Sequence, residues 1–221
     1  MGRPTTRIEV VTVAHEYASG GSAFARRLGE ALGWPVLDHD LVARVEARLR
    51  IAAHLGSPHA RPRPPSREIV AATLQLAPAE VSLGVGALDE LVFADGIVAA
   101  AREEIRLAAE RAPLVVAAPG AVAVLGDVPG ALHVALSVPL TERIVRHCAR
   151  TGHNAPYAVA EVRRRDHEYA THLRRHHGID VRDASLYDVV VNLARVGVEE
   201  AVEALVRLVR GRATLGVRAA I

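Results

Sequence analysis

Short runs of apolar residues alternate along the chain with segments whose apolar residues recur at helical spacing. The runs begin at Ile8, Trp34, Leu114, Ala131 and Asp188. The first is followed by a stripe of Phe24, Leu28 and Leu32 that ends at a glycine. Apolar runs without polar alternation are typical of strands that are buried on both faces. With helices between them, they predict an α/β fold with a parallel sheet covered on both sides.

The first run leads into a turn of small residues, Ala18-Ser19-Gly20-Gly21-Ser22, before the first helical stripe. A glycine turn between a strand and a helix directs backbone N–H groups and the positive end of the helix dipole at one point, where a phosphate can bind. The full phosphate-binding pattern G-x-x-x-x-G-K-[ST] is not met, because Gly21 stands at the lysine position. A phosphate site and a plain tight turn both remain open.

The chain between residues 38 and 110 departs from regular strand and helix alternation. Asp38 ends the second apolar run, where it can either cap the next helix or face a ligand. Residues 56–66 hold four prolines and few apolar groups, which predicts an exposed loop. Helical spacing returns at 67–76 and again from about 88 to 110. We therefore interpret residues 56–95 as a helical insert within one domain.

Composition narrows the chemistry more than it narrows the fold. The 221 residues include 27 basic and 25 acidic ones, and every basic residue is arginine. Phosphate contacts must therefore come from guanidinium groups or backbone amides, since no lysine amine exists. Cys148 is the single cysteine, so an intrachain disulfide and a four-cysteine zinc site are excluded. With no signal-like or membrane-spanning run, we expect a cytoplasmic protein without a membrane partner.

The most polar segment is 151–183, which contains Arg163, Arg164 and Arg165. Guanidinium groups on a helix can clamp a polyphosphate, or they can pair with neighbouring carboxylates on a solvated face. His172 and His176 stand four residues apart, but no third ligand is specified, so no metal site is predicted. Counter-charges and scarce aromatic residues argue against a nucleic-acid partner.

Taken in order, these features resemble the cytidylate-kinase-like family of P-loop proteins, relatives of nucleoside monophosphate kinases. The resemblance covers nearly the whole chain. The matching stretches are VTVAHEYASGGSAFARRLGEALGWPVLDHDLV (11–42), APLVVAAPGAVAVL (112–125), LSVPLTERI (136–144) and GIDVRDASLYDVVVNLARVGVEEAV (178–202). In the last stretch Asp180, Asp183, Tyr187, Asp188, Asn192 and Gly197 stand where the family typically keeps such residues.

The resemblance implies a three-layer α/β/α P-loop fold with a helical insert for the nucleoside monophosphate (56–95) and an arginine-rich lid (151–183). It implies ATP and Mg²⁺ as cofactors and phosphoryl transfer to a nucleoside monophosphate as the reaction. Carried over by position, Ser19, Gly20, Gly21 and Ser22 would bind ATP phosphates. Asp38 and Gly120 would contact the acceptor. Arg143, Arg163, Arg164 and Arg165 would supply the catalytic positive charge.

Three departures from the family pattern concern arginines. Relatives usually show Gly-Ser-Gly-Gly-Arg in the turn, preceded by Ser-Arg, and Val-Gly-Arg-Gly after a later strand. This chain has Ala18-Ser19-Gly20-Gly21-Ser22, preceded by Ala14-His15, and Ala117-Ala118-Pro119-Gly120. Lost guanidinium contacts to a transferred phosphate slow turnover strongly. The alternative is therefore a catalytically inactive relative that acts as a nucleotide sensor or a protein-interaction module. Oligomeric state and acceptor are left open.

Overall fold

The structure, a computed structural model, describes residues 7–55, 67–74, 87–111 and 113–217. Its sheet has five parallel strands in the order β2-β3-β1-β4-β5. The strands are β1 (Val10–His15), β2 (Val36–Leu37), β3 (Leu114–Val116), β4 (Ala131–Ser137) and β5 (Val189–Asn192). The predicted α/β fold with a parallel sheet is confirmed, since every apolar run contributes a strand.

Helices connect the strands and cover the sheet. They are α1 (Gly21–Leu32), α2 (Asp40–Leu55), α3 (Arg67–Thr73), α4 (Ala87–Ala109), α5 (Ala121–Val124), α6 (Leu140–Thr151), α7 (Ala155–His177), α8 (Leu193–Val196) and α9 (Val198–Val217), with a 3₁₀ turn η1 at Ala184–Leu186. Local sequence sets several boundaries. Asn154 caps α7 through Tyr157 N–H, and Gly178 ends it in the left-handed conformation.

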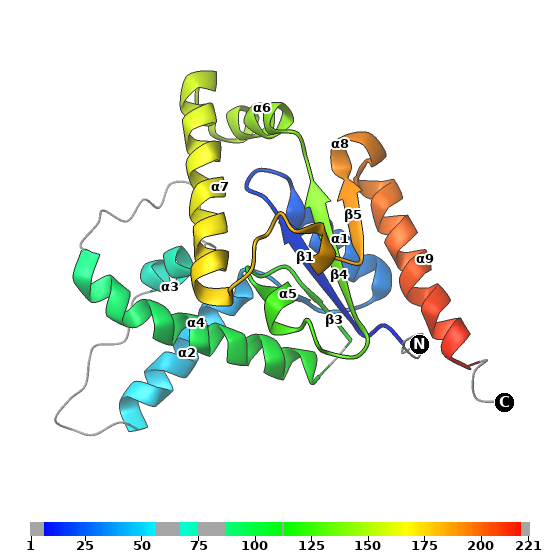
Figure 1. Cartoon of the computed structure of the whole chain (residues 1–221), viewed down its shortest axis with the longest axis horizontal. Coiled ribbons are helices and arrows are strands. Elements are labelled where there is room, and N and C mark those ends of the chain that lie inside the picture. The colour runs from blue at the N-terminus through cyan, green and yellow to red at the C-terminus, as the bar shows by residue number, and fades with distance from the viewer. Residues whose placement is uncertain (1–6, 56–66, 75–86, 112, 218–221) are drawn as a thin grey trace.

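Alternate residues of the strands face two separate apolar layers, which gives the three-layer α/β/α arrangement (Figure 1). On one face, Val11 and Val13 pack with Phe24 of α1 and Leu205 of α9. On the other face, strand residues such as Val116 pack against α2, α3, α4 and α5. Because both faces are covered, ligands can approach only along the strand ends.

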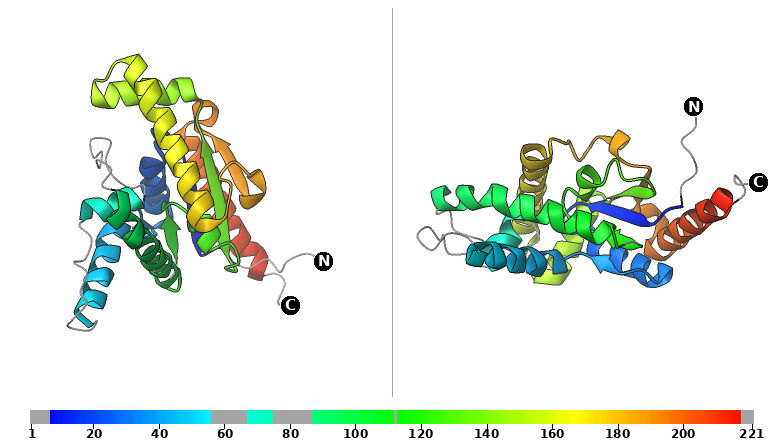
Figure 2. Two further views of the ribbon diagram at one scale, coloured as in Figure 1. Left: turned by 60° about the vertical axis from the view of Figure 1, so that its left-hand side comes forward. Right: turned by 90° about the horizontal axis from the view of Figure 1, so that it is seen from below.

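Helices α2 and α4 run side by side and extend away from the sheet, as both views of Figure 2 show. This part corresponds to the predicted insert, although its proposed loop at 56–66 lies outside the described residues. Helix α7 stands beside the sheet, and its C-terminal end comes down next to α5 and α4 (Figure 1). Among the described helices, none has the length and apolar character needed to cross a membrane.

Candidate functional site

The turn between β1 and α1 is held open by two residues in the left-handed region. Ala18 has φ 58° and Gly20 has φ 87°. Ser19 is buried, and both its N–H and its hydroxyl donate to Glu16 O, at 3.2 and 2.7 Å. Ser19 therefore fixes the turn with the groups that the sequence analysis expected at a phosphate. Gly20 precedes α1 without any side-chain cap, and its N–H and that of Gly21 have no acceptor among the described residues.

Gly21 owes its lack of a side chain to a histidine. A Cβ on Gly21 would lie 2.0 Å from Cγ of His15, so the ring packs directly on the glycine backbone. Burial lowers the pKa of His15 below its usual 6.5, in spite of the nearby carboxylate of Asp38, so the ring is neutral near pH 7. Ser22 follows in the first turn of α1, half-buried. The glycine pair thus serves the packing of the turn as well as its curvature.

Asp38 is a buried carboxylate that the protein does not satisfy. The residue is 7% exposed, and neither carboxylate oxygen has a hydrogen-bond partner within the described part of the chain. The nearest cations, Arg26 and His39, stand 3.8 and 3.9 Å away, beyond hydrogen-bond distance. A buried carboxylate without donors is costly and marks a place where a ligand or ion supplies them. Of the two readings of Asp38, a residue facing a ligand fits this geometry.

Arg146 of α6 brings a guanidinium group to the turn. Its Nη1 donates to Ser19 O at 2.7 Å and lies 3.6 Å from the position of a Cβ on Gly20. Its Nη2 pairs with Glu142. Sequence reasoning missed this residue, although Arg146 follows Arg143 by three positions and so shares a helix face with it. In a chain without lysine, it places a cation where the phosphate-binding lysine would otherwise stand.

Arg143, predicted as a catalytic residue, is an internal tie between the turn, α6 and α7. It is 4% exposed, and its Nη1 and Nη2 donate to both carboxylate oxygens of Asp166, at 2.8 and 2.9 Å. Nε donates to Val138 O and Nη1 also donates to Tyr17 O, each at 3.1 Å. These bonds occupy the guanidinium group in this structure, so a role at the phosphates stays a prediction.

The three predicted lid arginines differ in what holds them. Arg164 pairs with Glu161 and Glu168, with nitrogen–oxygen distances of 2.7 and 2.5 Å. Arg165 donates to Glu161 at 3.0 Å and lies over the ring of Tyr17, 5.5 Å from its centroid. Arg163 is exposed and has no ion pair in the described regions. The structure does not gather the three side chains at one point.

Gly120, predicted to contact the acceptor, lies beneath the end of α7. Its φ is 77°, and an added Cβ would meet the ring of His177 at 2.3 Å. The position therefore requires glycine both for its backbone angle and for the close approach of the ring. The segment where relatives carry an arginine is covered here by a histidine from another helix.

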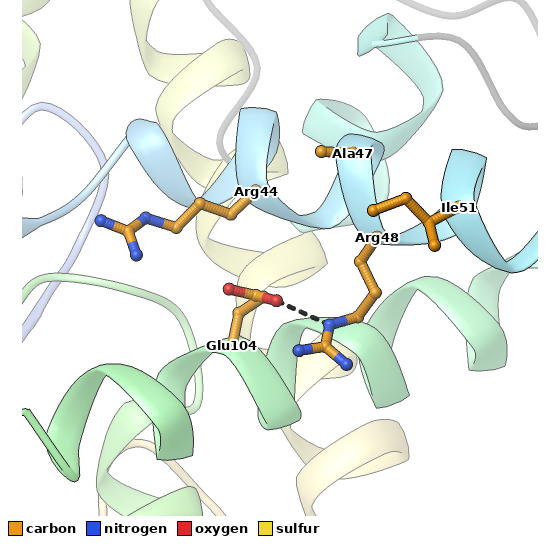
Figure 3. A pocket seen from close by; sticks show the side chains of 5 residues that line it. All are labelled: Arg44, Ala47, Arg48, Ile51 and Glu104. Carbon is orange, nitrogen blue, oxygen red and sulfur yellow. Dashed lines mark hydrogen bonds and ion pairs between the residues drawn. The ribbon is translucent and has the colours of Figure 1, made fainter.

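A depression of about 430 Å³ lies between α2 and α4 (Figure 3). It is lined by Arg44, Ala47, Arg48, Ile51 and Glu104. Arg48 donates to Glu104 at 2.6 Å, whereas Arg44 extends along the groove without an ion pair among the described side chains. Arg44 was also missed from the sequence, although it lies six residues after Asp38. It leaves a free cation on the insert.

The residues quoted from the last matching stretch make local bonds. Asp188 accepts from His133 N–H at 2.8 Å. Asp183 and Asn192 cap the turns that follow them, and the hydroxyl of Tyr187 donates to Val181 O. Across the described residues, no group of three histidine, cysteine, aspartate or glutamate side chains is arranged to hold a metal ion. A divalent cation at this site would therefore need oxygen ligands from a bound phosphate.

Solved structures with a similar fold are mostly kinases. A protein of Eubacterium ventriosum with unassigned function aligns with a TM-score of 0.65 at 16% identity, over 93% of this chain and 99% of its own. A gluconokinase from Sinorhizobium meliloti gives 0.52 at 22% identity, over 96% and 99%. A shikimate kinase from Bacteroides thetaiotaomicron gives 0.51 at 12% identity, over 91% and 98%. These likenesses establish a P-loop kinase fold.

Two curated relatives match part of the chain. The cytidylate kinase of Desulfurococcus amylolyticus is 34% identical over 70 residues, which are 32% of this chain and 38% of that protein. The cytidylate kinase of Ignicoccus hospitalis is 34% identical over 77 residues, 35% of this chain and 45% of that protein. The alignments therefore span less than half the length of either relative.

The strongest relationship extends across most of the fold. The profile of the cytidylate kinase-like family matches residues 10–195, from the first strand through the whole of α7 to the short helix after β5. That range includes the turn at Gly20, the buried Asp38 and both arginines of α6. The chain belongs to the cytidylate kinase-like family.

Proposed function

We propose that this protein transfers a phosphoryl group from ATP to a nucleoside monophosphate of the cytidine type. The observation that carries the proposal is Asp38, a buried carboxylate whose two oxygens have no hydrogen-bond partner within the described residues. His15 connects it to the turn, since its ring packs on Gly21 while the charge of Asp38 acts on its pKa. Carboxylate and open N–H groups are thus neighbours, as phosphoryl transfer requires.

The donor phosphates would lie on the turn. The N–H groups of Gly20 and Gly21 lie at the N-terminus of α1, which favours negative charge. Arg146 reaches the same point from α6 and would neutralise phosphate charge once it leaves Ser19 O. Asp38, together with the phosphates themselves, has the oxygen ligands that suit Mg²⁺. Bound with the nucleotide, Mg²⁺ would supply charge neutralisation between the phosphates.

The acceptor would lie between Asp38 and the insert. The unpaired Arg44 and the depression beside it place a cationic groove on the same helix that Asp38 precedes. A guanidinium group can bind a monophosphate bidentately, which would orient the acceptor for attack. The curated relatives are cytidylate kinases, which makes CMP the first acceptor to test.

The test is ADP formation by the purified protein with ATP, Mg²⁺ and a panel of nucleoside monophosphates. Asp38→Asn keeps the shape of the side chain and removes its charge, so turnover should fall by about two orders of magnitude or more. Asp127→Asn, an exposed residue beyond α5, is the matched control and should leave turnover unchanged. Equal activity of wild-type protein and Asp38→Asn would exclude Asp38 from the site.

The pairing of the predicted lid arginines favours a second candidate, a nucleotide sensor without turnover. Arg143 is bound to Asp166, and Arg164 and Arg165 are bound to Glu161. A protein of this kind would be stabilised by ATP, by about 2.7 kcal/mol at a hundred times the dissociation constant, yet would form no ADP. Gly20→Val should abolish that stabilisation in either case, because a side chain there would meet Arg146 and strain the turn.

A further inference from the structure

Three histidines gather at the C-terminal end of α7. His172 and His176 have ring centroids 4.9 Å apart, and those of His172 and His177 are 5.7 Å apart. His172 is 7% exposed, and the side chain of His176 is 10% exposed. The cluster is therefore part of the packed interior between helices, in spite of its position in the most polar segment of the chain.

The cluster joins three elements that are distant in sequence. The ring of His177 packs on Gly120 before α5, and Nδ1 of His176 lies 3.3 Å from a carboxylate oxygen of Asp95 on α4. Figure 1 shows the end of α7 beside α5 and over α4. This is the side of the sheet where the family resemblance places the acceptor, next to the strand end that precedes Gly120.

Positive charge dominates the surroundings of the cluster. Arg102 of α4 acts electrostatically on all three histidines, and Arg175 acts on His176. Arg102 is half-buried and has no ion pair among the described residues. Asp95 is the carboxylate that faces the cluster, and its side chain is 81% exposed. Asp95 can therefore turn into solvent without loss of buried contacts.

Burial and Arg102 keep the imidazoles neutral. Burial is the larger cause in each case, and it lowers the pKa of His172 to about 3 and that of His177 to about 4, while the pKa of His176 is also lowered. Asp95 acts in the opposite direction on His176. Neutral imidazoles beside an uncompensated guanidinium group can gain protons as soon as negative charge is bound among them.

We propose that His172, His176, His177 and Arg102 form a binding site for a doubly charged oxyanion, the phosphate group of the acceptor substrate. Arg102 supplies a permanent charge and up to two parallel N–H donors, and the imidazoles add N–H donors around it. The same guanidinium group repels a metal cation, which separates this site from a histidine metal centre. The identity of the anion as an acceptor phosphate rests on the proposed function, whereas the anion site itself does not.

Binding at this site takes up protons. A dianion among the histidines raises their pKa values above those of the free protein, so the bound state holds more protons than the free state. Affinity is then highest at low pH and falls as pH rises through the pKa values of the bound state. Sulfate is the probe of choice, because its own charge does not change across this range.

Isothermal titration of the full chain with sulfate, and separately with CMP and cytidine, tests the site. Sulfate and CMP should bind with proton uptake, measured as a dependence of the heat on the ionisation enthalpy of the buffer, and cytidine should bind at least tenfold more weakly than CMP. The imidazole resonances of His172, His176 and His177 should shift on titration. Binding of sulfate without proton uptake, or with unshifted imidazoles, would overturn the proposal.

Arg102→Gln should weaken sulfate binding about tenfold or more, since a charge-assisted hydrogen bond is lost. Arg106→Gln, one turn further along α4 and exposed, is the matched control and should bind like wild type. Equal effects of the two variants would reject the site. If sulfate binds as described but no nucleotide supports turnover, the anion site stands and the kinase proposal fails. If turnover is strong and unchanged in Arg102→Gln, the kinase proposal stands and this site fails.

Discussion

The two halves of α7 carry the same kind of residue and treat it in opposite ways. In the first half, Arg164 and Arg165 have Glu161 within one turn, and Asp166 binds the buried Arg143. In the second half, His172, His176 and His177 face Arg102 with the single exposed carboxylate of Asp95. One half is neutralised by its own carboxylates, whereas the other is left with uncompensated positive charge.

This difference bears on where the protein can bind an anion. A carboxylate three or four residues from an arginine lies on the same helix face and competes with any ligand for it. The first half of α7 is therefore best suited to hold α6 and the phosphate-binding turn together. Cations with freedom to bind a ligand come from elsewhere: Arg146 beside the turn, Arg44 on α2 and Arg102 on α4.

The largest effect is expected from breaking the first half at its buried pair. Asp166→Ala leaves the guanidinium group of Arg143 4% exposed without its bidentate partner, which should cost about 3–5 kcal/mol of unfolding free energy. Urea unfolding followed by circular dichroism measures it. Asp127→Ala, on the surface after α5, provides the baseline for loss of an exposed carboxylate.

A cost below 1 kcal/mol would contradict the assignment of Arg143 as a tie between α6 and α7. In that event Glu16, whose carboxylate lies 3.5 Å from Arg143 Nη2, would be the partner that compensates. Burial raises the pKa of Glu16, which Arg143 opposes. The double variant of Asp166→Ala with Glu16→Gln would then show the full loss, and a second small cost would remove the tie altogether.

A smaller effect is expected where the second half meets Gly120. Gly120→Ala adds a Cβ 2.3 Å from the ring of His177 at φ 77°, which should cost about 2–3 kcal/mol through backbone strain and steric overlap. Gly152→Ala is the matched control, since its φ is 74° and nothing lies within 4 Å of the added atom. It should cost about 1 kcal/mol, measured by the same unfolding experiment.

The steric part can be isolated by a second substitution. In a His177→Ala background, Gly120→Ala should cost no more than Gly152→Ala, because the ring that the methyl group meets is gone. Equal costs of the two glycine substitutions in the wild-type chain would show that the end of α7 does not pack on Gly120.

The histidines of the second half should make stability depend on pH. The pKa values of His172 and His177 are lowered from 6.5 to about 3 and about 4 in the folded chain, so the unfolded chain binds more protons. Their contribution is fully present above about pH 6.5 and is lost as pH falls. Between about pH 7 and pH 5 each should cost about 1–2 kcal/mol.

The measurement is unfolding free energy across this range for wild type, His172→Gln and His177→Gln. Each variant should show a flatter decline on acidification than wild type, while His167→Gln, exposed on the same helix, should follow wild type. A wild-type slope retained in both cluster variants would mean that other groups cause the acid sensitivity.

The fold could be predicted from the sequence because its signals are local. Apolar runs beginning at Ile8, Leu114 and Ala131 fix buried strands, and glycines such as Gly33 and Gly178 end helices through left-handed angles that few other residues accept. Parallel order then follows from the helices between the strands. Each step needs only neighbours in the chain.

The site could be predicted only in part because its contacts are distant. The turn at Gly20 and the aspartate after β2 were identified, since each follows a strand. That Arg143 would be consumed by Asp166, and that Arg146 would reach Ser19 from 127 positions away, depends on how α6 packs on the turn. Likewise, nothing local indicates that His177 covers Gly120 or that Arg102 faces the histidines.

The smallest effect sharpens the comparison within the first half. Arg164 pairs with Glu161 and Glu168, and the bond to Glu161 is the first cause that raises its pKa. Its side chain is 43% exposed, so solvent screens these charges. Arg164→Ala should therefore cost at most about 0.5 kcal/mol, and the cost should shrink with added salt. Arg163→Ala, the exposed neighbour without an ion pair, is the control. A cost for Arg164→Ala that approached that of Asp166→Ala and resisted salt would mean that the outer carboxylates hold α7 in place as firmly as the buried one does.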